Sequence, residues 1–124
     1  MPKRVLVVDD TLCARSQMRD ILAAAGYEVH EAGNGDDAVT RYRELRPDLV
    51  TMDIVLPKKS GIDATREIVE GDPGARVVIC SGLGQETLVE EAVGAGAADY
   101  LVKPFHPHDV LRIVRKALGE TAAG

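Results

Sequence analysis

Hydrophobic residues along the chain follow two alternating patterns. Short, mostly apolar runs occupy residues 4–9, 27–32, 48–53, 75–80 and 99–103, and they have the length and composition of β-strands. Between these runs, and after the last one, apolar residues recur every three or four positions, which is the spacing of an amphipathic helix. Five strands that alternate with five helices through short connections predict an α/β fold with parallel strands and right-handed crossovers.

The predicted helices carry boundary signals of their own. Gly26 stands where a helix C′ residue belongs. Asn34 is a good N-cap with Asp37 three residues later, Ser60 can cap the third helix, and Pro107 suits the first turn of the last one. The residues expected to face the core are Met18, Ile21, Leu22 and Ala25, then Ala38, Tyr42 and Leu45, then Ile62, Thr65, Ile68 and Val69, then Leu88, Val89, Ala92 and Val93, and finally Val110, Leu111, Val114, Ala117 and Leu118.

The strands differ in pattern. The run at 4–9 is apolar almost throughout, which is typical of a strand that is covered on both faces. The run at 27–32 alternates apolar and polar residues, which favours an edge strand. Residues 119–124, with the sequence GETAAG, are expected to form a short frayed tail.

Composition narrows the class of protein. The 124 residues suit one domain, 1–124, and no linker or low-complexity segment divides them. The net charge of −5 argues against sequence-independent binding to nucleic acid. No apolar run approaches a membrane span, and we expect a cytoplasmic protein. Cys13 and Cys80 lack metal-ligand spacing, and we expect two reduced, partly buried thiols.

Polar side chains stand where the predicted strands end. Asp9 and Asp10 end the first strand, Asp53 ends the third, Ser81 follows the fourth, and Lys103 ends the fifth. Ligands of an open α/β sheet bind at the carboxyl ends of its strands. Three carboxylates, a hydroxyl and an ammonium are therefore expected along one edge of the sheet.

Crowded carboxylates need a counter-charge. Two unit charges about 4 Å apart repel by roughly 4 kcal/mol at an effective dielectric constant of 20. Oxygen ligands without His or Cys favour Mg²⁺, or Mn²⁺, over Zn²⁺. A cation, Lys103 and the Ser81 hydroxyl could together hold a phosphoryl group beside Asp53, which is enough for phosphoryl transfer.

Four stretches make a resemblance specific: "VLVVDDT", "DLVTMDIVLPKKSGIDA", "VVICSG" and "DYLVKPF". They resemble the receiver domain of two-component response regulators, and the single-domain CheY-like proteins in particular, over Arg4 to about Leu118. The resemblance implies a flavodoxin-like (βα)5 doubly wound sheet of order 2-1-3-4-5, an order already known for CheY. It also implies a single receiver domain without an output domain.

The resemblance implies roles for the acids. Asp53 is the expected phosphoacceptor, and it would take its phosphoryl group from a phosphohistidine on a histidine kinase or phosphotransfer protein. Asp10, Asp53 and the main-chain carbonyl of Val55 would ligate Mg²⁺, and Asp9 would act mainly through bound water.

The resemblance also implies a switch. Ser81 and Lys103 would each contact a phosphoryl oxygen, and Tyr100 would swing inward when the hydroxyl moves. The Lys103–Pro104 peptide bond is expected to be cis. The changed surface of the fourth helix, fifth strand and fifth helix would control a partner protein. The expected pathway is chemotaxis, with the flagellar motor as the target. The chain would then be a switch that removes its own phosphoryl group, and not an enzyme with a separate substrate. It is also expected to be a monomer.

Three alternatives remain open. An aspartyl-phosphate phosphatase of the haloacid dehalogenase type uses similar groups, but its nucleophile would stand on the first strand in a DxD pattern. A nucleotide or flavin module would need a phosphate-cradling first turn, whereas "DDTLCAR" repels phosphate unless a cation intervenes. A phosphorelay intermediate or phosphate sink would carry the same residues. The basic side chains Arg112, Arg115 and Lys116 suit either an output surface or a solvated helix face.

Overall fold

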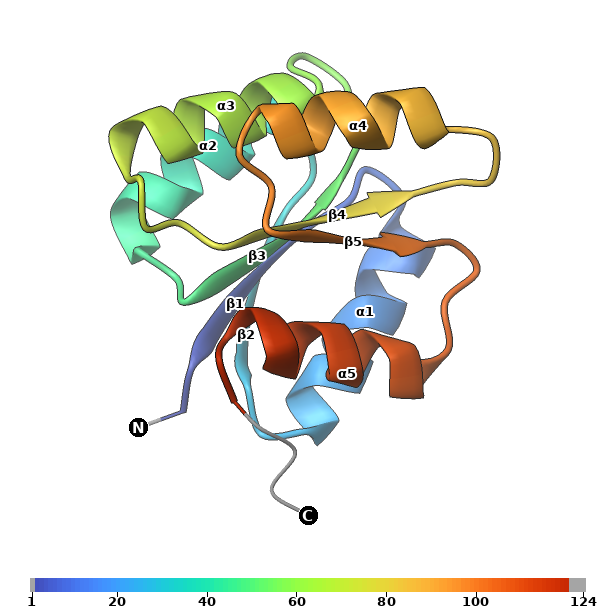
Figure 1. Ribbon diagram of the computed structural model, residues 1–124. Coiled ribbons are helices and arrows are strands. Elements are labelled where there is room, and N and C mark those ends of the chain that lie inside the picture. Colours follow the sequence, from blue (N-terminus) through green and yellow to red (C-terminus); the bar gives the residue numbers. More distant parts are fainter. Residues whose placement is uncertain (1, 121–124) are drawn as a thin grey trace.

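A computed structural model describes residues 2–120, and most of the predicted frayed tail lies outside them. Five parallel strands form one sheet in the order β2-β1-β3-β4-β5, with five helices around it (Figure 1). The elements are β1 (Arg4–Val8), α1 (Leu12–Ala24), β2 (Glu28–Ala32), α2 (Gly35–Leu45), β3 (Leu49–Asp53), α3 (Gly61–Gly71), β4 (Val77–Ser81), α4 (Glu86–Gly94), β5 (Asp99–Val102) and α5 (Pro107–Ala117). The predicted flavodoxin-like α/β fold and its strand order are confirmed, and the predicted edge strand is β2.

Two helical layers cover the sheet. Helices α2, α3 and α4 lie on one face, and α1 and α5 lie on the other (Figure 1). Alternate residues of β1 divide between the two cores: Leu6 and Val8 belong to the first, Val5 and Val7 to the second. This explains the unbroken apolar run in the sequence, because a central strand meets apolar neighbours on both of its faces.

The predicted helix boundaries hold at the atomic level. Asn34 Oδ1 accepts a hydrogen bond from Asp37 N at 2.8 Å, and Ser60 Oγ accepts one from Asp63 N. Gly26 follows α1 with a φ of +95°, a backbone conformation that glycine adopts without a steric penalty. Pro107 is the first residue of α5. These caps satisfy main-chain groups at the ends of the helices and fix where the intervening loops begin.

Some predictions about strand bounds and core residues were wrong. The fourth strand runs over Val77–Ser81 instead of 75–80, because a turn extends to Ala75, whose N–H bonds Asp72 O. Val93 is exposed, since its side of α4 borders a hollow instead of the sheet. Ile113 is buried although it was absent from the predicted stripe of α5.

The two cysteines differ instead of sharing partial burial. Cys13 is exposed in the first turn of α1, whereas Cys80 is buried in β4. Burial raises the pKa of the Cys80 thiol to about 12. None of the helices within residues 2–120 is long and apolar enough to cross a bilayer.

Candidate functional site

Three carboxylates converge at the carboxyl ends of the neighbouring strands β1 and β3. Val8 pairs with Met52 in the parallel ladder, so the residues that follow them reach the same edge of the sheet. One oxygen each of Asp9, Asp10 and Asp53 lies within 4.8 Å of the others. Asp9 is buried, Asp53 is partly buried and Asp10 is exposed. The predicted acidic cluster is therefore assembled in the fold.

Lys103 reaches this cluster from the end of β5. Its Nζ lies 3.0 Å from Asp9 Oδ2 and 3.3 Å from Asp53 Oδ2. Its main-chain N–H donates to Ser81 O at 2.7 Å, which ties the end of β5 to the end of β4. The Lys103–Pro104 peptide bond is cis. The ammonium thus stands between two carboxylates. A phosphoryl group on Asp53 would bring further negative charge to the same place.

Burial and charge oppose each other at this site. Burial raises the pKa of the Asp53 carboxyl, Lys103 lowers it, and the neighbouring Asp9 and Asp10 raise it, so that the net pKa lies above its ordinary value. Burial lowers the pKa of Lys103, but its contacts with Asp9 and Asp53 outweigh that effect and leave the pKa raised. The site is therefore short of positive charge and suited to a further cation.

The donor set suits a hard divalent ion. All the clustered ligand atoms are carboxylate oxygens, and such ligands select Mg²⁺ or Mn²⁺. Val55 lies in the loop after β3 with its side chain exposed. The expectation that its main-chain carbonyl completes the metal site stays a prediction.

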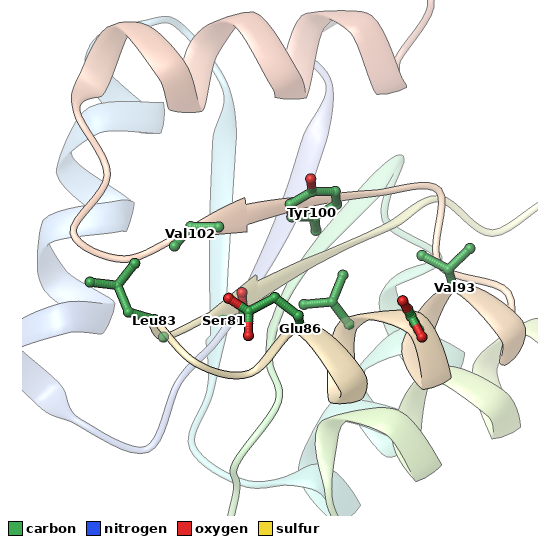
Figure 2. A pocket seen from close by; sticks show the side chains of 9 residues that line it. Ser81, Leu83, Glu86, Val93, Tyr100 and Val102 are labelled. Atoms are coloured by element: carbon green, nitrogen blue, oxygen red, sulfur yellow. The ribbon is translucent and has the colours of Figure 1, made fainter.

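Ser81 and Tyr100 lie on the side of the sheet that carries α4. Ser81 is buried at the end of β4, and its hydroxyl donates to Leu101 O over a long 3.5 Å. The Tyr100 side chain is half exposed on β5, and both residues line one hollow between β5 and α4 (Figure 2). A weakly held hydroxyl beside an exposed ring is compatible with the predicted switch.

Two supporting residues were missed by the sequence analysis. Arg15 Nη1 donates to the main-chain oxygen of Asp9 at 2.7 Å, while its Nε pairs with Glu31 at 3.0 Å. Gly61 packs so closely on the main-chain oxygen of Asp53 that a Cβ would overlap it. Arg15 lies one turn after Thr11, the N-cap residue of α1. This position, close to the end of β1, could have identified Arg15 in the sequence as a residue that supports the site.

The chain is similar to known proteins over most of its length. The model of the response regulator receiver domain matches residues 5–115. The chemotaxis protein CheY of Thermotoga maritima is 51% identical over 117 residues, which cover 94% of this chain and 98% of that protein. CheY of Bacillus subtilis is 47% identical over 119 residues, covering 95% of this chain and 99% of that protein.

A solved structure agrees in fold. The crystal structure of the CheX-CheY-BeF3-Mg+2 complex from Borrelia burgdorferi contains a chain that is 36% identical and superimposes with a TM-score of 0.89. The match covers 94% of this chain and 89% of that one.

Proposed function

The chain belongs to the family of response regulator receiver domains, and we propose that it is a phosphorylation switch whose phosphoacceptor is Asp53. The observation that supports this most is the set of three carboxylates within 4.8 Å, with the Lys103 ammonium 3.3 Å from Asp53. CheY-like receiver domains are signalling proteins of two-component systems, not enzymes with a separate substrate. The haloacid dehalogenase alternative would need its nucleophile after β1 in a DxD pattern, whereas the two acids after β1, Asp9 and Asp10, are adjacent.

The proposed reaction is an in-line transfer from a partner's phosphohistidine. A carboxylate oxygen of Asp53 attacks phosphorus, the P–O bond forms as the P–N bond breaks, and the imidazole keeps the electron pair of the broken bond. Asp10, Asp53 and the Val55 carbonyl would hold Mg²⁺, with Asp9 acting through water. Bound Mg²⁺ supplies positive charge against the negative charge of the transferred group, and Mn²⁺ could replace it.

The remaining side chains act on the phosphoryl oxygens. Lys103 is already placed between Asp9 and Asp53 and would pair with one oxygen. The Ser81 hydroxyl would leave its weak contact with Leu101 O and donate to another. Hydrolysis by water would later return Asp53 to the free carboxylate.

The conformational response would follow from the movement of Ser81. The β4–α4 loop would follow the hydroxyl, and the Tyr100 ring would enter the space that the loop vacates. The altered face of α4, β5 and α5 would then change its affinity for a downstream protein. Such a ligand-biased equilibrium needs contacts that differ between the two states, and the phosphoryl–Ser81 bond is one.

Chemotaxis is the pathway that the similarity to CheY proteins favours, with a histidine kinase upstream and a flagellar motor protein downstream. A phosphorelay intermediate or a phosphate sink would use the same site and would differ only in its partners. We propose a cytoplasmic monomer that binds neither nucleic acid nor membrane.

Mass spectrometry tests the site. The protein is incubated with Mg²⁺ and acetyl phosphate, and the intact mass and the modified peptide are measured. The wild type should gain one phosphoryl group on Asp53, Asp53→Asn should gain none, and the exposed control Asp20→Asn should behave as the wild type. A phosphoryl group found on Ser81 or on a histidine would overturn the mechanism.

A further inference from the structure

The loop between β3 and α3, residues 54–60, follows directly on Asp53. Its two ends are held together, because Gly61 N donates to Ile54 O at 2.8 Å and Gly61 packs on the main-chain oxygen of Asp53. Val55, whose carbonyl is a proposed ligand of Mg²⁺, stands between these residues in the sequence, and its side chain is exposed. A fixed position for this carbonyl requires that the rest of the loop is held as well.

Lys59 attaches the far end of this loop to two helices. Its ammonium lies 3.5 Å from Asp36 Oδ1 in the first turn of α2, and it also pairs with the Glu67 carboxylate of α3. The Lys59 side chain is only 27% exposed, so these ion pairs are partly shielded from solvent and from salt. The main chain is held at the same place, because a Cβ on Gly35 would overlap Lys59 O. One residue thus joins the loop to the start of α2 and to α3.

A strained turn lies immediately before Lys59. Lys58 has a φ of +70°, in the left-handed region that residues other than glycine rarely adopt, and Lys59 N donates to Pro57 O at 2.8 Å across it. A hydrogen bond between residues two apart around a positive φ is the strained form of a γ-turn, and strained backbone persists where surrounding contacts hold it. Lys58 is exposed and, among the described residues, has no carboxylate within 4.0 Å. The contacts of Lys59 with α2 and α3 are placed to hold this turn.

We propose that Lys59 is a positioning residue of the metal site: its ion pairs with Asp36 and Glu67 hold the β3–α3 loop in the conformation in which the Val55 carbonyl can ligate Mg²⁺. The inference rests on the proposed function and adds a residue that contacts neither the metal nor the phosphoryl group. Without the ammonium, two neighbouring carboxylates would repel each other and the turn would lose its support. The loop would then sample more conformations, and Mg²⁺ binding would have to order it.

A purely electrostatic role for Lys59 predicts the opposite sign. A lysine near the acidic cluster repels Mg²⁺, so removal of its charge alone should tighten Mg²⁺ binding. Loss of a positioning contact should weaken it. Lys58 provides the matched control, because its neutralisation removes the same charge from the adjacent position of the same loop without breaking an ion pair.

Calorimetric titration of the full chain with Mg²⁺ tests the sign. Lys59→Met should weaken Mg²⁺ binding about threefold or more, and Lys59→Gln should do the same, whereas Lys58→Met should leave the affinity unchanged or slightly higher. Lys59→Arg keeps the charge and should bind Mg²⁺ within about twofold of the wild type. The difference between wild type and Lys59→Met should shrink as salt is raised, because salt screens the ion pairs. Binding by Lys59→Met as tight as that of Lys58→Met would overturn the proposal.

A mutant cycle tests whether the ion pairs carry the effect. In a background of Asp36→Asn combined with Glu67→Gln, Lys59 has lost both of its acidic partners, and Lys59→Met should no longer weaken Mg²⁺ binding. A loss as large as in the wild-type background would overturn the proposal, because the ion pairs would then not be its cause. Backbone relaxation in NMR spectra of the metal-free protein gives a second readout. Residues 54–58 should become more mobile in Lys59→Met and stay as in the wild type in Lys58→Met.

The positioning role and the proposed function can fail separately. If the wild type binds Mg²⁺ and is phosphorylated on Asp53 while Lys59→Met binds Mg²⁺ as Lys58→Met does, the positioning role is wrong and the proposed function stands. If Lys59→Met loosens the loop and weakens Mg²⁺ binding while Asp53 of the wild type is never phosphorylated, the reverse holds. A loop that loosens without any loss of Mg²⁺ affinity would overturn the positioning role, and a wild type that binds no Mg²⁺ would overturn both.

Discussion

The Lys103 ammonium lies 3.3 Å from Oδ2 of Asp53, and yet the pKa of that carboxyl is raised. Burial is the largest cause, and the nearby carboxylates of Asp9 and Asp10 add to it. One lysine therefore does not compensate three acids. Ionised Asp53 makes the folded state less stable, and this has consequences for pH, for metal binding and for the choice of substitutions.

The first expectation concerns pH. Because the folded-state pKa of Asp53 lies above its unfolded value, the folded state binds more protons between the two values, and stability rises as the pH falls through that window. Asp53→Asn should therefore raise the free energy of unfolding near pH 7 in metal-free buffer, and the gain should shrink toward about pH 4. Urea unfolding across this range measures it. A gain that stays constant would contradict the stated cause.

Asp10→Asn should weaken Mg²⁺ binding by roughly tenfold or more, since one of the charged ligands is lost. The same change should raise the melting temperature in metal-free buffer, because it relieves repulsion among the three acids. Calorimetric titration with Mg²⁺ and thermal unfolding in a chelator give the two readouts, with the exposed Asp20→Asn as control. Unchanged Mg²⁺ affinity would remove Asp10 from the metal site.

Ser81→Ala should separate phosphorylation from its consequence. The hydroxyl makes only a long hydrogen bond to Leu101 O, so its loss should cost less than about 1 kcal/mol of stability. Asp53 should still be phosphorylated, but the amide signals of Leu83 and Tyr100 should no longer respond to fluoroberyllate and Mg²⁺ in NMR spectra. If they shift as far as in the wild type, Ser81 does not couple the site to the outer face.

The lifetime of the phosphoryl group should depend on Val55 and Leu83. These are the residues two positions after Asp53 and Ser81, and both are apolar and exposed. Neither can orient an attacking water, so Val55→Asn combined with Leu83→Glu should speed phosphoryl loss by about tenfold, equivalent to ~1.4 kcal/mol in the barrier. Phosphoryl loss from the purified proteins is followed over time. A double variant no faster than the wild type would refute this explanation.

Thr65 on α3 offers a test of the core. Its hydroxyl is fully buried and finds no hydrogen-bond partner among the described residues. Thr65→Val keeps the shape and removes this unpaired group, so it should raise the free energy of unfolding by about 1 kcal/mol. The exposed Thr40→Val on α2 is the matched control and should change it little. Destabilisation by Thr65→Val would mean that the hydroxyl is bonded in solution.

Local chemistry made much of this fold predictable. Asn34 caps α2 because its side chain and the Asp37 N–H are three residues apart, which sequence alone can show. The acids of β1 and β3 were likewise predictable, because parallel strands end on one edge. The sequence also placed Lys103 at this edge, but not its choice of partner: Lys103 and Asp9 are 94 positions apart, and their 3.0 Å contact depends on the complete sheet.

Errors in the predicted core have the same origin. The spacing of Val93 places it on an apolar stripe of α4, but only Leu88, Val89 and Ala92 of that stripe pack against the core, and Val93 borders the hollow beside β5, the last strand. Ile113 is buried because the inner face of α5 is rotated toward it relative to the predicted stripe. Periodicity shows that a helix has an apolar side, and only packing decides which residue of that side is covered.

The position of each strand in the sheet also divides the molecule by how easily it opens. β1 and β3 have neighbours on both sides and helices on both faces, so we expect their amide hydrogens to exchange only when most of the protein unfolds. β5 has one neighbouring strand and two exposed apolar side chains. Local unfolding of this edge would withdraw Lys103 from Asp9 and Asp53 and leave the acids in place. We therefore expect the strands that lead to Asp9 and Asp53 to open last, and the edge strand that leads to Lys103 to open among the first.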